Sequence, residues 1–493
     1  MSGRRLGPGA ALVALTLGGT LVACGAGMLL CGAVGVADGE AALALGLPGL
    51  AAVALGLAIV LGPASAPPRG LSVRPVAGML AVTLAWLSAS VVGAVPLLAA
   101  GTFSSPLDAF FEGASGFTTT GATLIRDVGA EPSAVLLWRS IMQWLGGVGI
   151  VVLVVAIAPV TGPGVQRAFY AETSGVTAER LTPRIIDTAK IIASIYAGLS
   201  VAAVLAYAIA GMGLLDAVNH AMTTISTGGF STRTASIGAF HSLPIELVAI
   251  VLMILSGVNF AFYWRAVRGR PVMPQAAEVL AFLAILFAAI VAVALSIWLA
   301  DDVSGGAASL RDAAFSVTSV ITTTGFVTVD FDAWNSFARV TILVLMSIGA
   351  CAGSTVGGMK VIRVVLLGRA ARHELDRQLH PTAVKVLRFG GHVYSEDVRR
   401  AVLGFFLVYA LVYVVGSLAM AASGLDPLSA IAATAATLNV VGPGVGDVGA
   451  TDNYEAVSTF GRAFLPFLMI AGRVEVFTVV ALIAALLRPR ARG

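Results

Sequence analysis

The stretch DAFFEGASGFTTTG runs from Asp108 to Gly121, and DAAFSVTSVITTTG runs from Asp312 to Gly325. Both begin with Asp-Ala and end in three threonines and a glycine, with the same spacing from aspartate to glycine. A third copy, DAVNHAMTTISTG, starts at Asp216, and a more divergent fourth, DPLSAIAATAATLNVVG, starts at Asp426. This self-similarity predicts one structural unit repeated four times along the chain.

Long apolar segments flank every copy. Of the 493 residues, 58% are hydrophobic and 11% are charged, and the mean hydropathy is +0.94, well above soluble domains. A bilayer core of about 30 Å takes about 20 helical residues to cross. Helices satisfy their own backbone in lipid, so the sequence predicts an all-α polytopic membrane protein. The stretches long enough to span lie near residues 10–36, 42–62, 75–100, 134–160, 187–212, 243–267, 275–299, 337–367, 398–423 and 456–487.

Each copy is too short to cross the membrane. From aspartate to glycine a helix would rise only about 15–20 Å, so the segment must enter the membrane and return on the same side. The aspartate suits the first helical turn or the N-cap, where a carboxylate satisfies free N–H groups. Ordinary extracellular loops are the alternative. Such loops would not place a carboxylate 13, 12, 13 and 16 residues before a glycine, as the four copies do.

The segment that follows each short helix suits cation binding. The helix C-terminus directs a partial negative charge inward, and backbone carbonyls left unpaired at membrane depth are tolerated only beside water or ions. Such carbonyls can replace the hydration shell of an ion. No Asp or Glu occurs among these residues, which favours weakly held monovalent cations over Ca²⁺. The predicted filter comprises Thr118, Thr119, Thr120, Gly121; Ile225, Ser226, Thr227, Gly228; Thr322, Thr323, Thr324, Gly325; and Asn439, Val440, Val441, Gly442.

Several motifs resemble one family of membrane proteins. They are FFEGASGFTTTGAT, WRSIMQWLGGVGIVVL, AETSGVTAERLTPRIIDTAK, SGVNFAFYW, GACAGSTVGGMKVIRV and TLNVVGPGVG. From about residue 70 to the C-terminus the chain is similar to the TrkH-type proteins of the Trk/Ktr/HKT superfamily of K⁺ transporters. The resemblance implies four M1–pore-loop–M2 repeats around one pseudo-fourfold pore, plus two extra N-terminal transmembrane helices. We expect units at 1–66, 67–184, 185–271, 272–390 and 391–493.

The resemblance also implies a function and partners. We expect K⁺ uptake, with K⁺ held at the filter residues, no cofactor in this chain, a homodimer, and a cytosolic nucleotide-binding regulatory subunit of the TrkA type that binds NAD, ATP or ADP. Gly121 favours K⁺, because relatives that admit Na⁺ often carry serine there. A Na⁺-selective transporter or an H⁺/Na⁺-coupled K⁺ symporter is the alternative. We expect no nucleic-acid partner.

Two features lie within predicted spans. Gly349, Gly353, Ser354, Thr355, Gly357 and Gly358 suggest an unwound segment, although close helix packing through small residues is the alternative. The resemblance makes this segment an intramembrane gate loop. Arg473 is a charge at bilayer depth, which indicates function unless it is paired with Glu475 or another carboxylate. By resemblance, Arg473 faces the cavity below the filter and raises a barrier there.

The remaining polar residues suggest structural roles. We expect Glu112, His220 and Asn259 to brace the backbone, and the other histidines show no metal-ligand spacing. Cys24, Cys31 and Cys351 are expected as free buried thiols, although LVAC at Cys24 resembles a lipoprotein cleavage box. No nucleophile with a base is evident, so an enzyme is not expected.

Basic residues fall in alternate connections, which predicts orientation. Under the positive-inside tendency these faces and both termini are cytoplasmic, in a multi-pass protein of the cell inner membrane. By resemblance, the basic run from Lys360 to Arg400 is a docking surface for the regulator. The other residues that carry this prediction are Arg4, Arg5, Arg69, Arg74, Arg167, Arg180, Arg184, Lys190, Arg265, Arg268, Arg270, Arg488, Arg490 and Arg492.

Overall fold

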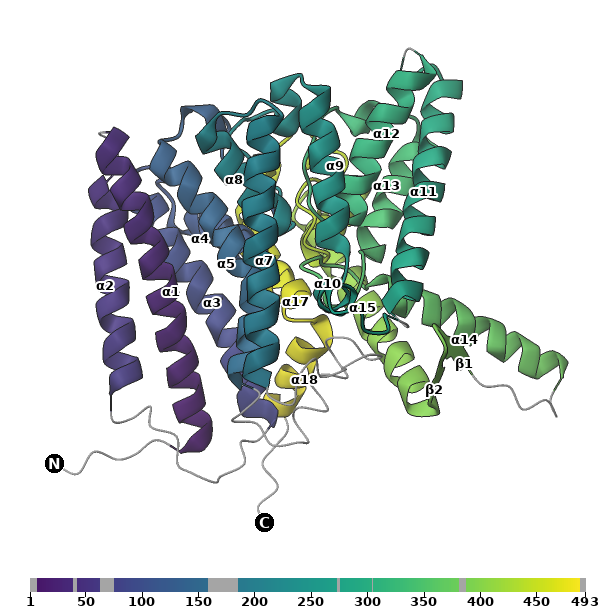
Figure 1. Cartoon of the computed structure of the whole chain (residues 1–493), viewed down its shortest axis with the longest axis horizontal. Coiled ribbons are helices and arrows are strands. Elements are labelled where there is room, and N and C mark those ends of the chain that lie inside the picture. Colours follow the sequence, from purple (N-terminus) through teal and green to yellow (C-terminus); the bar gives the residue numbers. More distant parts are fainter. Residues whose placement is uncertain are drawn as a thin grey trace.

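The computed structural model describes residues 7–38, 42–62, 75–157, 185–272, 275–303, 305–380 and 387–487. Its helices stand side by side in one bundle (Figure 1). In the described part of the chain, the strands are β1 (Leu387–Phe389) and β2 (His392–Tyr394), which pair antiparallel. These strands and helix α14 (Val361–Leu379) project from one side of the bundle (Figure 1).

The element order recurs four times. A long helix is followed by a short helix, a 3-10 helix and then one further helix in the first set or two in the others. The first set is α3 (Pro75–Ala99), α4 (Pro106–Thr118), η1 (Val128–Ala130) and α5 (Ser133–Ile157). The second is α7 (Ile185–Ile209), α8 (Leu214–Ile225), η2 (Ser236–Phe240), α9 (Leu243–Gly257) and α10 (Phe260–Val267). The third is α11 (Gln275–Leu299), α12 (Gly306–Ile321), η3 (Phe331–Ala333), α13 (Ser336–Ile348) and α14. The fourth is α15 (Glu396–Ala422), α16 (Pro427–Leu438), η4 (Tyr454–Ala456), α17 (Thr459–Arg473) and α18 (Val476–Leu487).

Two helices precede these sets. Helices α1 (Pro8–Asp38) and α2 (Ala42–Leu61) pack closely along glycines. A methyl group on Gly49 would lie 3.0 Å from Gly25 O, and one on Gly56 would overlap Gly18 O. Glycine at these positions therefore lets the two backbones approach, as at many helix contacts in membranes. Cys24 and Cys31 lie in α1, and both are free and buried, as is Cys351.

The described helices include fewer straight spans than the ten predicted. Six are long and apolar enough to cross a membrane, namely α1, α2, α3, α7, α11 and α15. Two further pairs qualify together but are bent, α9 with α10 by 89° and α17 with α18 by 106°. The remaining predicted stretches correspond to α5 and to α13, which ends well before residue 367. Continuous spans at 243–267 and 456–487 are therefore wrong, because each stretch contains a break, whereas the break within 337–367 is the predicted one.

The short helices begin differently from one another. Ser105 caps α4 and Asp426 caps α16, with Pro106 and Pro427 next in sequence. Asp108 and Asp216 lie in first turns as expected, but Asp312 does not, because α12 begins at Gly306. In their C-terminal halves, the short helices are almost entirely buried.

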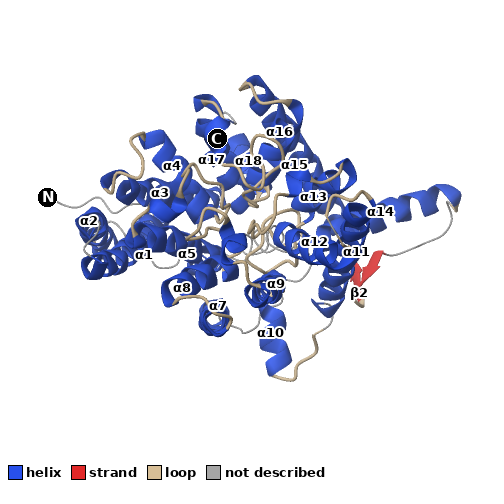
Figure 2. Cartoon of the chain, turned by 90° about the horizontal axis from the view of Figure 1, so that it is seen from above, coloured by secondary structure: helices blue, strands red, loops and turns tan. Residues whose placement is uncertain are grey.

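Seen from above, loop segments occupy the centre of the molecule with helices around them (Figure 2). The largest cluster of buried apolar side chains joins α11, α12, α13, α15, α16 and α17. A second joins α1, α3, α4 and α5. Apolar packing on the outside therefore positions the central loops.

Several sequence predictions concern residues outside the described ranges. The basic residues Arg4, Arg5, Arg69, Arg74, Arg167, Arg180, Arg184, Arg488, Arg490 and Arg492 are among them. So are the proposed unit boundaries at 66/67 and 184/185 and most of the motif AETSGVTAERLTPRIIDTAK.

Candidate functional site

The four short helices end in the same backbone conformation. At the end of each helix one residue other than glycine takes a positive φ, namely Thr119, Thr227, Thr323 and Val440. A glycine with positive φ follows two residues later, at Gly121, Gly229, Gly325 and Gly442. Between them, the N–H groups of Thr120, Gly228, Thr324 and Val441 each donate to the carbonyl five residues back, at 2.8–2.9 Å. This is the hydrogen-bond pattern of a Schellman helix end, formed four times.

This pattern corrects the predicted alignment of the second copy. Gly229, and not Gly228, is equivalent to the other three glycines. Ile225 was predicted in the filter, but it is the last residue of α8, one position before the equivalent segment. With Gly229 as the end point, the spacing from Asp216 is 13 residues, equal to the first and third copies. The tandem Gly228-Gly229 and this equal spacing could have revealed the register.

The four segments, 118–121, 226–229, 322–325 and 439–442, close into a ring. Each positive-φ glycine abuts a carbonyl oxygen of the next segment, so that a methyl group there would overlap it. The contacts run from Gly121 to Gly228 O, from Gly229 to Thr324 O, from Gly325 to Val441 O and from Gly442 to Thr120 O. Both the positive φ and the close oxygen therefore require glycine at these positions.

Threonine side chains of the ring bond locally. The Thr118 hydroxyl donates to Ala114 O at 2.6 Å, and Thr322 donates to Thr318 O at 2.7 Å. The hydroxyls of Thr118 and Thr120 lie 2.7 Å apart. These hydroxyls are therefore engaged with their own helix ends and do not donate to the backbone oxygens of the ring.

The first segment is braced by a buried ion pair. Glu112 of α4 accepts from Arg139 of α5 at 2.8 Å, and their side chains are 0% and 2% exposed. The same carboxylate accepts from the Thr123 hydroxyl at 2.9 Å and from Leu124 N at 3.1 Å. Glu112 therefore fixes the chain just after Gly121. At the equivalent place in α8, His220 contacts Asp216 O at 2.8 Å and the Ser231 hydroxyl at 2.9 Å.

Two further braces were missed by the sequence analysis. Gln143 of α5 donates to Gly228 O at 2.6 Å and accepts from Phe230 N at 3.0 Å. Tyr454 donates to Gly442 O at 2.6 Å. A lone buried amide in an apolar span could have drawn attention to Gln143. No sequence signal connects Tyr454 with the fourth segment beyond its proximity in the chain.

The segment between α13 and α14, residues 349–360, lies against the C-terminal ends of three short helices. Its interruption of the helix is as predicted. The Thr355 hydroxyl donates to Ile225 O at 3.1 Å, and Gly357 N donates to the Thr323 hydroxyl at 2.8 Å. A methyl group on Gly357 would overlap Asn439 O. The segment thus contacts the second, third and fourth sets of elements together.

The break after α9 supports the same segment. Asn259, expected to brace the backbone, caps α10 by accepting from Ala261 N at 2.8 Å. Phe260 N donates to Gly353 O at 3.1 Å, and Cys351 N donates to Gly257 O at 3.0 Å. Backbone groups freed by one break therefore pair with those freed by the other.

Arg473 joins this segment to the first set. It is the last residue of α17 and does not lie in the middle of a continuous helix as expected. Its guanidinium donates to Thr355 O at 2.6 Å and to Gly146 O of α5 at 2.9 Å. Glu475 does not pair with Arg473, but with Arg363 of α14 at 2.8 Å. A buried cation thus bridges backbone carbonyls of two sets.

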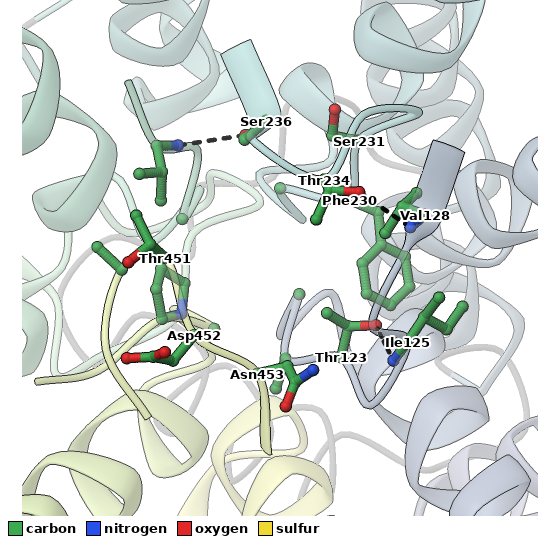
Figure 3. A pocket seen from close by; sticks show the side chains of 18 of the residues that line it. Thr123, Ile125, Val128, Phe230, Ser231, Thr234, Ser236, Thr451, Asp452 and Asn453 are labelled. Atoms are coloured by element: carbon green, nitrogen blue, oxygen red, sulfur yellow. Dashed lines mark hydrogen bonds between the residues drawn. The ribbon is translucent and has the colours of Figure 1, made fainter. Parts of the chain in front are cut away.

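A cavity of about 110 Å³ opens on the opposite side of the ring. All four positive-φ glycines line it, together with loop residues that follow each short helix. Figure 3 shows Ile125 and Val128 on one side and Thr451 and Asp452 on the other. At its rim, the Arg126 guanidinium hydrogen-bonds Glu455 and holds the pKa of that carboxyl below its ordinary value.

The described residues contain no group of three or more His, Cys, Asp or Glu side chains able to hold a metal ion. The ring of backbone oxygens beneath this cavity is therefore the site of interest. A sequence model of the TrkH family, described as a cation transport protein, matches residues 66–491. The chain belongs to the TrkH family of cation transport proteins.

Individual TrkH relatives support this assignment. The chain is 40% identical to the Trk system potassium uptake protein TrkH of Escherichia coli (strain K12), over 82% of this chain and 84% of the relative. It is 38% identical to TrkH of Halomonas elongata, over 87% and 90%. The crystal structure of the potassium transporter TrkH from Vibrio parahaemolyticus superposes with a TM-score of 0.86 at 35% identity, covering 97% of this chain and 99% of that one. The chain is thus a multi-pass membrane transporter and not an enzyme.

The brace at Glu112 predicts a stability effect. Glu112→Ala leaves the buried Arg139 guanidinium without its carboxylate, which costs about 3–5 kcal/mol. We expect a markedly lower unfolding temperature for the variant in detergent. Glu374→Ala removes a carboxylate from a surface pair with Arg377 and serves as the control, with a loss under about 1 kcal/mol. Equal unfolding temperatures for the two variants would contradict the bracing role.

Proposed function

We propose that this protein mediates K⁺ uptake across the cell inner membrane through one pore lined by backbone carbonyls. The observation that carries this proposal is the closed ring of four glycine-terminated segments. Carbonyl rings of this kind replace the water around a monovalent cation. The names of the relatives support K⁺ as the cation, since those from Escherichia coli and Halomonas elongata are potassium uptake proteins.

The four sets of elements act as four M1–pore-loop–M2 repeats around this pore. The recurring element order and the cyclic contacts between the segments support this arrangement. In this proposal residues 1–66 form two additional transmembrane helices. Residues 67–184, 185–271, 272–390 and 391–493 are the four repeats.

The filter comprises the equivalent segments 118–121, 226–229, 322–325 and 439–442. Its side chains are neutral, so the ligands are dipoles and not full charges. A neutral filter binds a cation weakly enough to release it on the other side. Gly121 adds no side chain to the first segment, where relatives that admit Na⁺ often carry serine, and this favours K⁺ over Na⁺.

The segment 349–360 acts as a gate below the filter, with Gly349, Gly353, Ser354, Thr355, Gly357, Gly358 and Arg473 as its working residues. Contacts of this segment with three short helices, and of Arg473 with α5, support the assignment. Movement of the segment would open the path. The positive charge of Arg473 raises a barrier for cations beside it.

Partners and orientation complete the proposal. The protein forms a homodimer and is controlled by a cytosolic nucleotide-binding subunit of the TrkA type. The faces rich in arginine, and both termini, are cytoplasmic. Helix α14, which carries several arginines and projects from the bundle, supports a docking surface on that side (Figure 1).

The test is K⁺ uptake by the protein itself. Cells that lack K⁺ uptake should grow on limiting K⁺ when they express it, and proteoliposomes should take up Rb⁺ with or without the regulator. Absence of both growth and Rb⁺ flux would refute the proposal. Reversal potentials in K⁺ and Na⁺ gradients at several pH values separate a K⁺ pathway from a Na⁺-selective or H⁺/Na⁺-coupled transporter.

The ring contact at Gly121 predicts a selectivity change. Gly121→Ser adds a side chain that overlaps Gly228 O and is strained at the positive φ of 82°. We expect the K⁺/Na⁺ permeability ratio to fall at least about tenfold, equivalent to about 1.4 kcal/mol. The control is Thr123→Ser, which retains the hydroxyl bonded to Glu112. Equal permeability ratios in both variants would show that Gly121 is not part of the filter.

The position of Arg473 predicts a change in flux. Arg473→Ala removes the charge and releases Thr355 O from α5, so we expect K⁺ flux to increase several-fold in a folded protein. Arg473→Lys keeps the charge but has fewer donors and should give an intermediate flux. The measurement is initial Rb⁺ uptake per reconstituted protein. Unchanged or abolished uptake in correctly folded Arg473→Ala protein would disprove the barrier.

A further inference from the structure

The cavity above the ring is lined by four charged side chains, three basic and one acidic. They are Arg126, Arg139, Arg233 and Asp452. Any ion that enters the ring from this side passes through the cavity, because the four positive-φ glycines line it. The charge balance of this cavity therefore acts on every entering ion.

Each of the three arginines is neutralised by a carboxylate. Arg126 pairs with Glu455, Arg139 pairs with Glu112 at 2.8 Å, and Arg233 pairs with Asp216 at 2.8 Å. The Arg139 pair is buried, so solvent does not separate it. The three basic groups thus contribute little net charge to the cavity.

Asp452 differs from these arginines. It is exposed, it lies between Thr451 and Asn453 on the side of the cavity away from Val128 (Figure 3), and its backbone N–H bonds to Gly449 O. Within the described part of the chain, its carboxylate forms no ion pair and accepts no hydrogen bond. The cavity therefore carries one uncompensated negative charge, and it belongs to Asp452.

From this arrangement we infer that Asp452 sets the rate at which cations enter the pore. The inference rests on the proposed K⁺ pathway and adds a residue outside the filter that determines conduction. A carboxylate in a cleft with low-dielectric walls raises the local cation concentration by focusing the field. The effect is long-range, so it acts equally on cations that the filter distinguishes.

Screening by salt provides the test. The Debye length is about 30 Å at about 0.01 M ionic strength and about 3 Å at about 1 M. We expect Asp452→Asn to lower initial uptake of tracer Rb⁺ into proteoliposomes about threefold at the low ionic strength. At the high ionic strength, set with N-methylglucamine chloride, we expect uptake equal to that of the unmodified protein. Asp452→Glu keeps the charge and should behave like the unmodified protein at both.

Asp447→Asn is the matched control. Asp447 is an exposed aspartate of the same connection, but it does not line the cavity. We expect loss of the Asp447 charge to change Rb⁺ uptake by less than about 1.5-fold at low ionic strength, because the electric field of Asp447 spreads into bulk water. The K⁺/Na⁺ permeability ratio should be unchanged in all of these variants.

Three outcomes would overturn the inference. The first is full uptake by Asp452→Asn at low ionic strength, the second is a loss that persists at high ionic strength, and the third is an equal loss in Asp447→Asn. In each of these the unmodified protein still takes up Rb⁺, so the proposed function survives. If the unmodified protein takes up no Rb⁺ at all, the proposed function fails and the inference falls with it.

Discussion

The close approach of a glycine to the carbonyl of the neighbouring segment is the contact on which the structure depends. It occurs four times, at Gly121, Gly229, Gly325 and Gly442, and the four contacts close a circle. Any Cβ would force two segments apart, and the positive φ angles would strain it further. Free carbonyl oxygens at this depth need water or a cation as a partner, so the shape of the ring and its proposed role have the same physical origin.

At the helix breaks around the ring, unpaired backbone groups likewise need hydrogen-bond partners. The breaks after α9, α13 and α17 leave backbone N–H and C=O groups without partners in their own helices. Phe260 N, at the break after α9, donates to Gly353 O, at the break after α13. Arg473, at the end of α17, donates to Thr355 O of the second break and to Gly146 O of α5. The irregular backbone at these breaks thus finds partners in side chains and in the other breaks. The segment 349–360 is held by such bonds and by apolar contacts of Ala350, Cys351 and Val356 with the surrounding helices.

The sequence predicted most of the long helices, the short helices between them and the unwound segment, because these depend on composition and local spacing. It did not predict the bends at residues 258–259 and 474–475, which depend on partners distant in the chain. The register of the second copy was wrong because the alignment ended at Gly228, although the positive φ at Thr227 and the equal spacing from Asp216 both point to Gly229. Gln143 was missed because its acceptor, Gly228 O, lies 85 positions away. Contacts of this kind come from tertiary packing.

Locating the bound ion tests the central claim most directly. Crystals or frozen grids of the protein prepared in Rb⁺ or Tl⁺ would show where a heavy congener of K⁺ rests. The account predicts density on the axis of the ring, ligated by backbone oxygens of all four segments and competed away by K⁺. Density only in the outer cavity or beside Arg473, with an unoccupied ring, would contradict it.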